Sequence, residues 1–456
     1  MIQYVLRADR VLVDGHLVPA SVGISGGHIA FLGDLDADCP AVHDVRLPGP
    51  VALLPAFVDT HVHVNDPGTD WEGFATATTA AAAGGIATIV DMPLDSDPVT
   101  TSAAALRVKE AAAEGNCAVS VGFWGGVVPD NLDQLAALAQ AGVRGFKCFL
   151  ADSGNPNFPH LTPEQFRAAM VRIAELGSLL LVHAESPAVL DASPRPVGGG
   201  YRSFLASRPD AAEEDAVGLV VDTARETGTR VHIVHVSSGR VLPLLAAAKA
   251  DGVAVTAETC PHYLTFGAEE VPDGGTEFAA CPPIRDGVNR ELLWAALADG
   301  TLDLVVSDHS PCDPQYKASG DFGSAFGGVS SLQLGPRAVW TQAVARGFGI
   351  AELSRWMSER PAALAGYPDR GRIAVGLRAD LCAFDPDAED TVRASELRHR
   401  HPVSPYDGVR LRGSVLQTWV GGVPAGLGQS TSKAGIYAPG PDNPRSHWPL
   451  SKAIGL

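Results

Sequence analysis

Residues 51–63 read VALLPAFVDTHVH, an apolar run of strand length that ends in two histidines separated by one valine. Alternate side chains of a β-strand point to the same side, so His61 and His63 are expected to face one common space. Imidazole is the commonest metal-ligating side chain in proteins, and such a pair is suited to a divalent cation. For an isolated pair, two histidines satisfied by ordinary hydrogen bonds at a strand end are the alternative.

The chain beyond this run alternates between strand and helix patterns. Eight short runs of β-branched and apolar residues are predicted as strands, at 52–60, 86–91, 117–123, 143–150, 179–183, 230–235, 253–258 and 302–307. Ala- and Leu-rich helical segments lie between them, at 102–114, 131–141, 162–176, 210–226 and 240–250, and Ser102, Asp130 and Thr162 are predicted N-caps. Eight strands alternating with helices predict an α/β fold of the (β/α)8 TIM barrel type, with a doubly wound parallel sheet as the alternative.

Both ends of the chain carry strand signals without helices. Residues 2–14 and 20–33 are predicted as strands, with the Gly-Gly pair at 26–27 marking a tight turn. The strand pattern returns at 371–386 and 414–426. We expect these segments to form a small β-sandwich built from both chain ends. The predicted organisation is a sandwich from 1–51 and 371–430, a barrel over 52–370, and an arm or tail over 431–456.

Further polar side chains follow other predicted strands. His183 ends LLLVH, His235 ends VHIVH, and Asp308 ends LDLVVSD. Lys147 lies within the apolar strand VRGFKCFL, where a buried ammonium without a partner is costly. The carboxyl ends of barrel strands meet at one mouth, so these groups and the histidine pair predict a metal site there. By strand alternation, His232 is expected to face the side opposite to His235, as a core or helix-facing residue, and His309 is expected to point away from Asp308 unless the loop overrides the alternation.

Composition and charge exclude several classes of protein. The net charge of −18 disfavours binding to nucleic acid, because the chain repels a phosphate backbone. Seven cysteines are scattered without a CxxC pair, which argues against a disulfide framework or a zinc finger and favours a reducing compartment. The sequence shows neither a signal-peptide pattern nor an apolar run long enough to span a membrane. We therefore expect a soluble cytoplasmic protein with no nucleic-acid or membrane partner.

Several motifs together resemble one known family. They are VALLPAFVDTHVHVNDPG (51–68), FKCF (146–149), LLLVHAE (179–185), VHIVHVSS (231–238), ETCPHY (258–263), CPPIRD (281–286), SDHSPC (307–312) and GRIAVGLRADL (371–381). The chain resembles the cyclic amidases of the amidohydrolase superfamily, which include hydantoinases, dihydroorotases and allantoinases. The resemblance covers nearly the whole chain and implies a barrel with a split sandwich. It also implies a homodimer or homotetramer.

The resemblance implies a binuclear metal centre. The six ligands would be His61, His63, Lys147, His183, His235 and Asp308. Lys147 would be N6-carboxylysine, formed with carbon dioxide or bicarbonate, and its carbamate would bridge the two cations. Zinc is expected, while manganese, cobalt, nickel and iron stay open. Asp308 would be the general base that takes a proton from the attacking water and delivers it to the leaving nitrogen.

The substrate is inferred from departures within the family. Dihydroorotases usually have an arginine two residues after the histidine pair, where this chain has Asn65. Hydantoinases usually have a tyrosine five residues after the lysine and an asparagine before a Gly-Gly pair, where this chain has Asp152 and Phe326. The stretches NDPGTDWEGF, DMPLDSDP, GFKCFLADSGNPNFP and HPVSPYDG resemble allantoinases. The resemblance thus implies hydrolysis of allantoin to allantoate, with a hydantoinase or dihydropyrimidinase, or a non-catalytic assembly protein, as alternatives.

Allantoin is a small polar ring with a ureido arm, so its pocket needs several hydrogen-bonding groups. The candidate contacts are Asn65, Asp152, Ser153, Gly154, Thr259, Ser310 and Phe326. Ordinary loop polarity is the alternative for each of them. Trp71, Glu72 and the stretch 201–209 are expected either to close the site or to pack against it. Four cysteines near the mouth are predicted to be buried thiols: Cys148, Cys260, Cys281 and Cys312.

Overall fold

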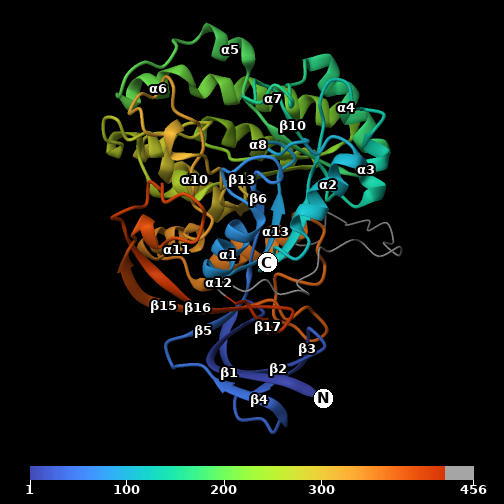
Figure 1. The fold of residues 1–456 in the computed structure, drawn as a ribbon, viewed down its shortest axis with the longest axis vertical. Coiled ribbons are helices and arrows are strands. Elements are labelled where there is room, and N and C mark those ends of the chain that lie inside the picture. Colours follow the sequence, from blue (N-terminus) through green and yellow to red (C-terminus); the bar gives the residue numbers. More distant parts are fainter. Residues whose placement is uncertain (427–456) are drawn as a thin grey trace.

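The computed structural model describes residues 1–426, so the predicted arm at 431–456 lies outside the described residues. A ring of parallel strands forms the centre of the molecule, with helices around it and a β layer at one end (Figure 1). The ring consists of β6 (Phe57–Val62), β7 (Ile86–Asp91), β8 (Ser120–Phe123), β9 (Gly125–Gly126), β10 (Phe146–Phe149), β11 (Leu179–His183), β12 (Arg230–Ile233), β13 (Val255–Thr259) and β14 (Leu304–Val305). Neighbours along this order are paired in parallel, except that β8 and β9 follow one another across Trp124.

The ring closes between its first and last strands. Val62 forms a parallel bridge with His309, and the His63 N–H donates to the His309 carbonyl oxygen over 2.8 Å. Since β8 and β9 act as one bent strand, eight strands make a closed circle. The predicted (β/α)8 barrel is confirmed, and the doubly wound sheet is wrong.

Helices surround the barrel in chain order. They are α1 (Phe74–Ala83), α2 (Ala103–Ala113), α3 (Leu135–Ala141), α4 (Pro163–Glu175), α5 (Pro187–Ala192), α6 (Tyr201–Ser207), α7 (Asp210–Thr227), α8 (Leu242–Ala250), α9 (Pro261–Thr265), α10 (Gly287–Asp299), α11 (Gly335–Ala345), α12 (Ile350–Ser354) and α13 (Arg360–Leu364). Ser102 and Thr162 cap α2 and α4 through their side-chain oxygens, as predicted. The predicted cap at Asp130 is wrong. The neighbouring Asn131 holds a turn there by bonding Val128, Thr101 and Gly126, so α3 begins only at Leu135.

The β layer combines strands from both ends of the described chain. β1 (Ile2–Val13) pairs with β2 (His16–Ser25), β4 (Ala41–Arg46) and β5 (Ala52–Pro55), and β2 pairs with β3 (His28–Asp34). β5 also pairs with β15 (Leu381–Thr391), which continues into β16 (Arg410–Val420) and β17 (Val423–Pro424). Gly26 and Gly27, at φ values of 58° and 81°, make the predicted turn between β2 and β3. An apolar core that includes Leu6, Val22, Leu53 and Trp419 fills this layer.

The strand predicted at 52–60 divides at Ala56. Its first part, β5, belongs to the β layer, whereas its second part, β6, opens the barrel. Both parts are buried, which is why they read as one apolar run in the sequence. Among residues 1–426, every helix is too short or too polar to cross a bilayer.

Candidate metal centre

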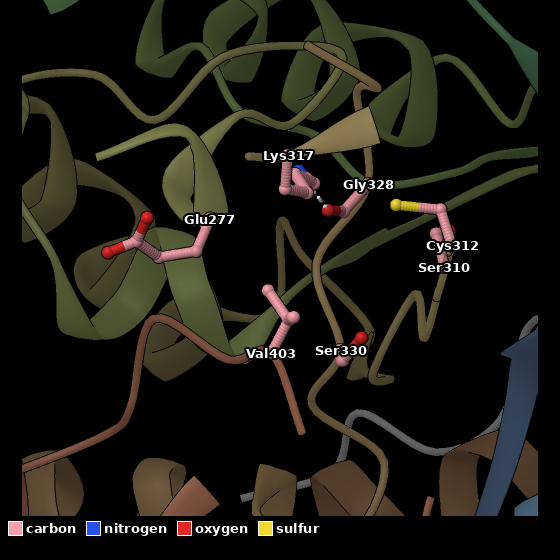
Figure 2. Close-up of a pocket in the computed structure, with 7 residues that line it drawn as sticks. All are labelled: Glu277, Ser310, Cys312, Lys317, Gly328, Ser330 and Val403. Carbon is pink, nitrogen blue, oxygen red and sulfur yellow. Dashed lines mark hydrogen bonds between the residues drawn. The ribbon is translucent and has the colours of Figure 1, made fainter. Parts of the chain in front are cut away.

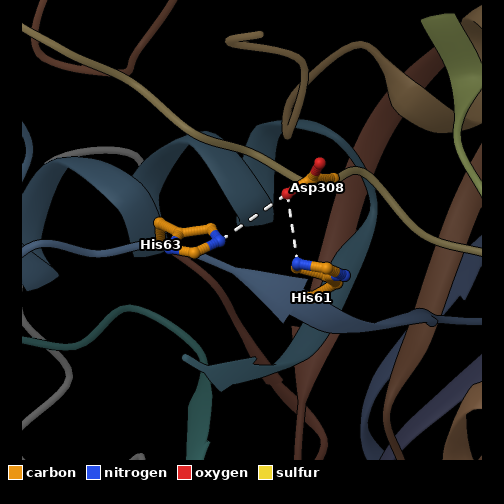
Figure 3. Close-up of side chains that lie close together, drawn as sticks. All are labelled: His61, His63 and Asp308. Atoms are coloured by element: carbon orange, nitrogen blue, oxygen red, sulfur yellow. Dashed lines mark ion pairs between the residues drawn. The ribbon is translucent and has the colours of Figure 1, made fainter. Parts of the chain in front are cut away.

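The histidine pair and Asp308 meet at the mouth of the barrel. His61 is the penultimate residue of β6, His63 directly follows that strand, and Asp308 lies in the loop after β14 (Figure 3). Oδ1 of Asp308 lies 3.1 Å from Nε2 of His61 and 3.6 Å from Nε2 of His63. One donor atom from each of the three residues lies within 4.8 Å of the others, a spacing that suits one small divalent cation.

The other three predicted ligands join this group through a series of ring contacts. The ring centroids of His61 and His235 are 5.5 Å apart, and those of His235 and His183 are 4.6 Å apart. Phe149 stacks on His183 at 4.6 Å, and Nζ of Lys147 lies 4.9 Å from the Phe149 ring centroid. The structure therefore brings all six predicted side chains to one mouth, although they come from five strands.

The nitrogens of these histidines suit a metal ion. Within residues 1–426, Nδ1 of His235 is buried without a hydrogen-bond partner; Nδ1 of His63 also has no hydrogen bond, but it lies 3.6 Å from Oδ2 of Asp95. Such orphaned nitrogens are costly in a folded protein unless another group binds them. Burial lowers the pKa of His61, His183 and His235, which favours the neutral imidazole that binds metals. The residues present therefore fit a divalent metal centre.

Lys147 is almost fully buried, at 1% exposure, in the middle of β10. Burial lowers the pKa of its amine to about 8, although the charges of Asp308 and Glu258 oppose this shift. A substantial fraction of the amine is therefore neutral near pH 8, unlike that of an ordinary lysine. A neutral amine is the form that can react with carbon dioxide.

Glu258 orients His61 from below the mouth. Its Oε1 accepts a hydrogen bond of 2.5 Å from Nδ1 of His61, and its Oε2 lies 2.9 Å from Nε2 of His232. Burial alone would raise the pKa of Glu258, but its contacts with His61 and His232 outweigh burial and lower the pKa to about 2. The paired carboxylate leaves Nε2 of His61 directed at Asp308.

His232 is buried in the core, which is one of the two placements expected, but it does not face away from the site. It contacts the carboxylate that orients His61, while His235 also faces the centre three residues later. Strand alternation fails here because His235 has a left-handed backbone, with φ of 39°, just beyond the end of β12. His309 is placed as expected: it is buried, and its Nε2 lies 3.4 Å from Oε2 of Glu72, away from the ligands.

Two further carboxylates support the centre. Asp59 accepts hydrogen bonds from the backbone N–H groups of His61 and Ser307, and burial raises its pKa to about 7. Glu185 binds Nε2 of His183 at 2.8 Å and the guanidinium of Arg208. Burial alone would raise the pKa of Glu185, but Arg208 and His183 outweigh it and lower the pKa to about 2. Sequence reasoning missed both acids, although each lies two residues from a predicted ligand.

The candidate substrate contacts occupy different environments. The Ser310 hydroxyl donates to Oδ1 of Asp308 over 3.1 Å. Asn65 donates to the Pro311 carbonyl, and its own Oδ1 is buried without a hydrogen-bond partner among the described residues. The Thr259 hydroxyl is buried and donates to the Val236 carbonyl. Asp152, Ser153 and Gly154 form a turn in which Asp152 accepts from the Gly154 N–H.

Aromatic side chains gather near these loops. Trp71 packs against Tyr316 and Phe326, with ring centroids 5.3 and 5.0 Å away. Glu72 instead is buried and accepts hydrogen bonds from the Arg400 N–H, which makes it a packing residue.

Beyond Ser310 lies a pocket lined by Glu277, Ser310, Cys312, Lys317, Gly328, Ser330 and Val403 (Figure 2). Lys317 donates to the carbonyls of Thr276, Ala279 and Gly328 and so joins the loop after β14 to residues 276–279. Cys148, Cys260 and Cys312 are buried as predicted, whereas Cys281 is partly exposed.

His262 is a second feature that the sequence reasoning missed. A ring nitrogen of His262 lies within 4.8 Å of a carboxylate oxygen of Asp308, and both of its nitrogens are buried without a hydrogen-bond partner in the described part of the chain. Burial lowers the pKa of His262 to about 4, so the ring is neutral at physiological pH. Two signals in the sequence mark His262: it follows β13, and it lies within the motif ETCPHY (258–263).

Known proteins resemble the chain over most of its length. The amidohydrolase family model matches residues 52–425. An allantoinase of Streptomyces avermitilis is 50% identical over 92% of this chain and 95% of its own, and one of Saccharomyces cerevisiae is 40% identical over 91% and 93%. The solved structure of the L-hydantoinase (dihydropyrimidinase) of Arthrobacter aurescens has a TM-score of 0.90 at 29% identity, covering 94% of this chain and 97% of its own. With this agreement in sequence and in overall fold, the chain belongs to the amidohydrolase family.

Proposed function

We propose that this chain is a metal-dependent cyclic amidase that hydrolyses the ring amide of allantoin to allantoate. The observation that carries the proposal is the convergence at one barrel mouth of six side chains whose chemistry suits metal binding. Relatives named allantoinase, 38–50% identical over nine-tenths of the chain, support allantoin as the substrate. A hydantoinase fits less well, because the solved hydantoinases are only 24–29% identical.

We assign His61, His63, Lys147, His183, His235 and Asp308 as ligands of two divalent cations, with Lys147 as N6-carboxylysine. A carbamate on Lys147 would turn a buried amine into an anion, which suits a lysine surrounded by imidazoles. Zinc is the metal we propose, because imidazole and carboxylate oxygens are among its usual ligands. When bound, the cations supply an activated water at neutral pH and polarise the scissile carbonyl.

Asp308 carries the proton in the reaction. Its carboxylate accepts a proton from the attacking water as the new carbon–oxygen bond forms. The same group then delivers that proton to the ring nitrogen as the carbon–nitrogen bond breaks, which opens the ring and yields a carboxylate product. The Ser310 hydroxyl, which donates to Oδ1, holds the carboxylate in place between these two transfers.

Several polar groups around Asp308 suit a ureide substrate. The buried Oδ1 of Asn65 has no hydrogen-bond partner within residues 1–426 and would accept from a substrate N–H. We propose Ser310 and the 152–154 turn as further contacts, with Phe326 packing beside the ring and Thr259 shaping the pocket wall. We further propose a cytoplasmic homodimer or homotetramer that acts in purine breakdown; seven free cysteines fit a reducing compartment.

A panel of cyclic amides tests the proposed substrate. The purified protein, supplied with zinc and bicarbonate, is assayed on allantoin, hydantoin, dihydrouracil and dihydroorotate. We expect kcat/KM to be highest for allantoin by at least about 100-fold, since a site built to hydrogen-bond a ureido arm rejects rings that lack it. Faster turnover of hydantoin or dihydrouracil than of allantoin would assign the chain hydantoinase activity instead. No turnover of any of the four rings would reject both activities.

Assembly of the centre is expected to depend on pH through Lys147. Because the pKa of its amine is about 8, the neutral fraction rises about 50-fold between pH 6 and pH 8. Metal-free protein mixed with zinc at a fixed concentration of dissolved carbon dioxide should therefore regain activity faster at pH 8, by a comparable factor. Stopped aliquots assayed at one common pH measure this rate. A rate independent of pH would contradict carboxylation of the free amine.

A further inference from the structure

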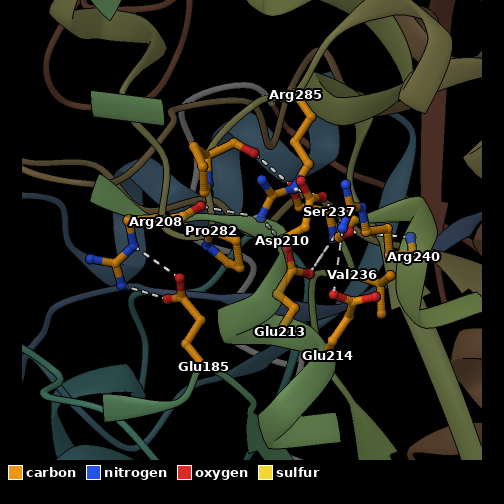
Figure 4. Close-up of polar contacts among 12 residues, drawn as sticks. Glu185, Arg208, Asp210, Glu213, Glu214, Val236, Ser237, Arg240, Pro282 and Arg285 are labelled. Carbon is orange, nitrogen blue, oxygen red and sulfur yellow. Dashed lines mark hydrogen bonds and ion pairs between the residues drawn. The ribbon is translucent and has the colours of Figure 1, made fainter. Parts of the chain in front are cut away.

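The segment between β11 and α7 (residues 184–209), called the covering segment below, contains α5, α6 and Arg208. Nε of Arg208 donates to Oε1 of Glu185 over 3.0 Å, and its terminal nitrogen donates to Oε2 over 2.5 Å (Figure 4). The same Oε2 lies 2.8 Å from Nε2 of His183. A continuous series of contacts thus runs from Arg208 of the covering segment, through Glu185, to the proposed metal ligand His183.

The chemistry of this series fixes the orientation of the imidazole. A guanidinium only donates and stays charged, so a two-pronged contact with Arg208 keeps Glu185 an acceptor and fixes its plane. Glu185 is buried, with 1% of its side chain exposed, so little water competes for its oxygens. The N–H of His183 must then be on Nε2, which leaves the lone pair of Nδ1 free for another partner.

His61 is oriented by a different arrangement. Its carboxylate partner, Glu258, is held by His232, and all three residues lie on barrel strands. Arg208, by contrast, lies between α6 and α7, outside the barrel strands. His183 is therefore the ligand whose orientation depends on how the covering segment is seated.

The covering segment is itself attached to other loops of the mouth. Tyr201 donates to the Ile284 carbonyl over 2.9 Å and packs its ring on Phe322, with centroids 5.2 Å apart. Phe204 packs on the same ring at 5.5 Å. Phe322 lies in the same loop after β14 as Asp308, so movement of this loop would be transmitted to Arg208 through α6.

We propose that Arg208 is a positioning residue of the metal centre. Through Glu185 it holds His183 with Nδ1 turned toward the cation, and it couples binding of one of the two metals to the seating of residues 184–209. This inference rests on the proposed role of His183 as a ligand. It predicts that the loss of Arg208 weakens one metal site without removing any ligand.

Zinc binding by full-length variants tests the proposal. Zinc is titrated into metal-free protein in competition with a coloured chelator, for the natural chain, Arg208→Met, Arg208→Lys and Arg378→Met. We expect Arg208→Met to weaken one of two sites by about 10- to 100-fold, the usual effect of removing a partner of a ligand. The zinc affinity of Arg208→Lys at this site should lie between those of the natural chain and Arg208→Met, because an ammonium pairs with one carboxylate oxygen rather than two.

Arg378→Met is the matched control. Arg378 also donates to both oxygens of a buried carboxylate, Asp380, at 3.1 Å, but Asp380 receives the backbone N–H of Gly421 rather than an imidazole. Loss of Arg378 should lower the Tm while both zinc affinities stay unchanged. Equal zinc affinities in Arg208→Met and the natural chain would overturn the proposal, as would an equal loss of affinity in Arg378→Met.

A second measurement separates this inference from the proposed function. Ring 15N signals of metal-free protein report the histidine tautomer, and the His183 signal is identified as the one missing from His183→Asn. The natural chain should show the Nε2–H form, and Arg208→Lys or Glu185→Gln should show a mixture. Absence of zinc binding in the natural chain would reject the proposed metal centre, while the tautomer would still decide the role of Arg208.

Discussion

Replacing Asp308 by asparagine is expected to lower kcat for allantoin by about 100- to 10,000-fold, the usual contribution of a general acid–base group. Asparagine keeps the shape and one oxygen near Nε2 of His61, which is 3.1 Å from Oδ1 in the natural chain. It cannot accept the proton of the attacking water. We therefore expect a large loss of kcat, a small change in KM, and most of the bound metal retained. Steady-state kinetics and metal content per chain measure these quantities.

The control for this change is Asp313→Asn in the same loop. Asp313 accepts from the Gln315 N–H at the start of a short helix and touches none of the six predicted ligands. We expect its kcat to stay within a factor of two or so of the natural value, as for most substitutions away from such sites. Near-natural turnover of Asp308→Asn would show that Asp308 is not the general base. Complete loss of bound metal in this variant would show that Asp308 acts only as a metal ligand.

Replacing Lys147 by alanine is expected to remove metal binding and activity together. The amine is buried in β10, with Nζ 4.9 Å from the Phe149 ring centroid, and a carbamate on it would be the ligand shared by the two proposed cations. Loss of the cations forfeits several kcal/mol of stabilisation of the transition state, so activity should fall about 1,000-fold or more. Acetate or propionate should restore part of both, because alanine leaves space for a small carboxylate. Metal content and kcat are measured with and without the added acid.

Lys109→Met is the matched control for loss of a buried lysine. Lys109 is as buried as Lys147, at 1% exposure, but it pairs with Asp91 at 2.7 Å and lies on α2. We expect a lower Tm, natural metal content and no response to added acid. Full activity of Lys147→Ala without acid would contradict the bridging role, and rescue of Lys109→Met by acid would show that the rescue is unspecific.

The sequence was sufficient to predict the parts of the site that depend on single strands. His61, His63, His183, His235 and Asp308 each follow an apolar run, and barrel strands carry their functional groups at that end. The eight-strand count also predicted the barrel correctly. These features are local, since a strand and the residues after it appear together in the sequence.

Features that depend on pairing between strands were not predictable in the same way. Glu258 contacts His61 across 197 positions of sequence, and Arg208 reaches Glu185 from a separate helix junction. His232 was misplaced because strand alternation assumes regular backbone, and the left-handed residue His235 interrupts it. The break at Ala56 was hidden for a similar reason: β5 and β6 are both fully buried, so burial gave no sign of two different sheets.

The most direct test of metal-dependent allantoin hydrolysis at this mouth is the turnover of allantoin before and after metal removal. The purified chain is stripped with a chelator, assayed for allantoate, and assayed again after zinc and bicarbonate are restored. The proposed centre predicts that stripping reduces turnover to about one-thousandth or less and that reloading restores it, with two zinc ions bound per chain. Undiminished turnover by the stripped protein, or no allantoate from the fully loaded protein, would contradict it.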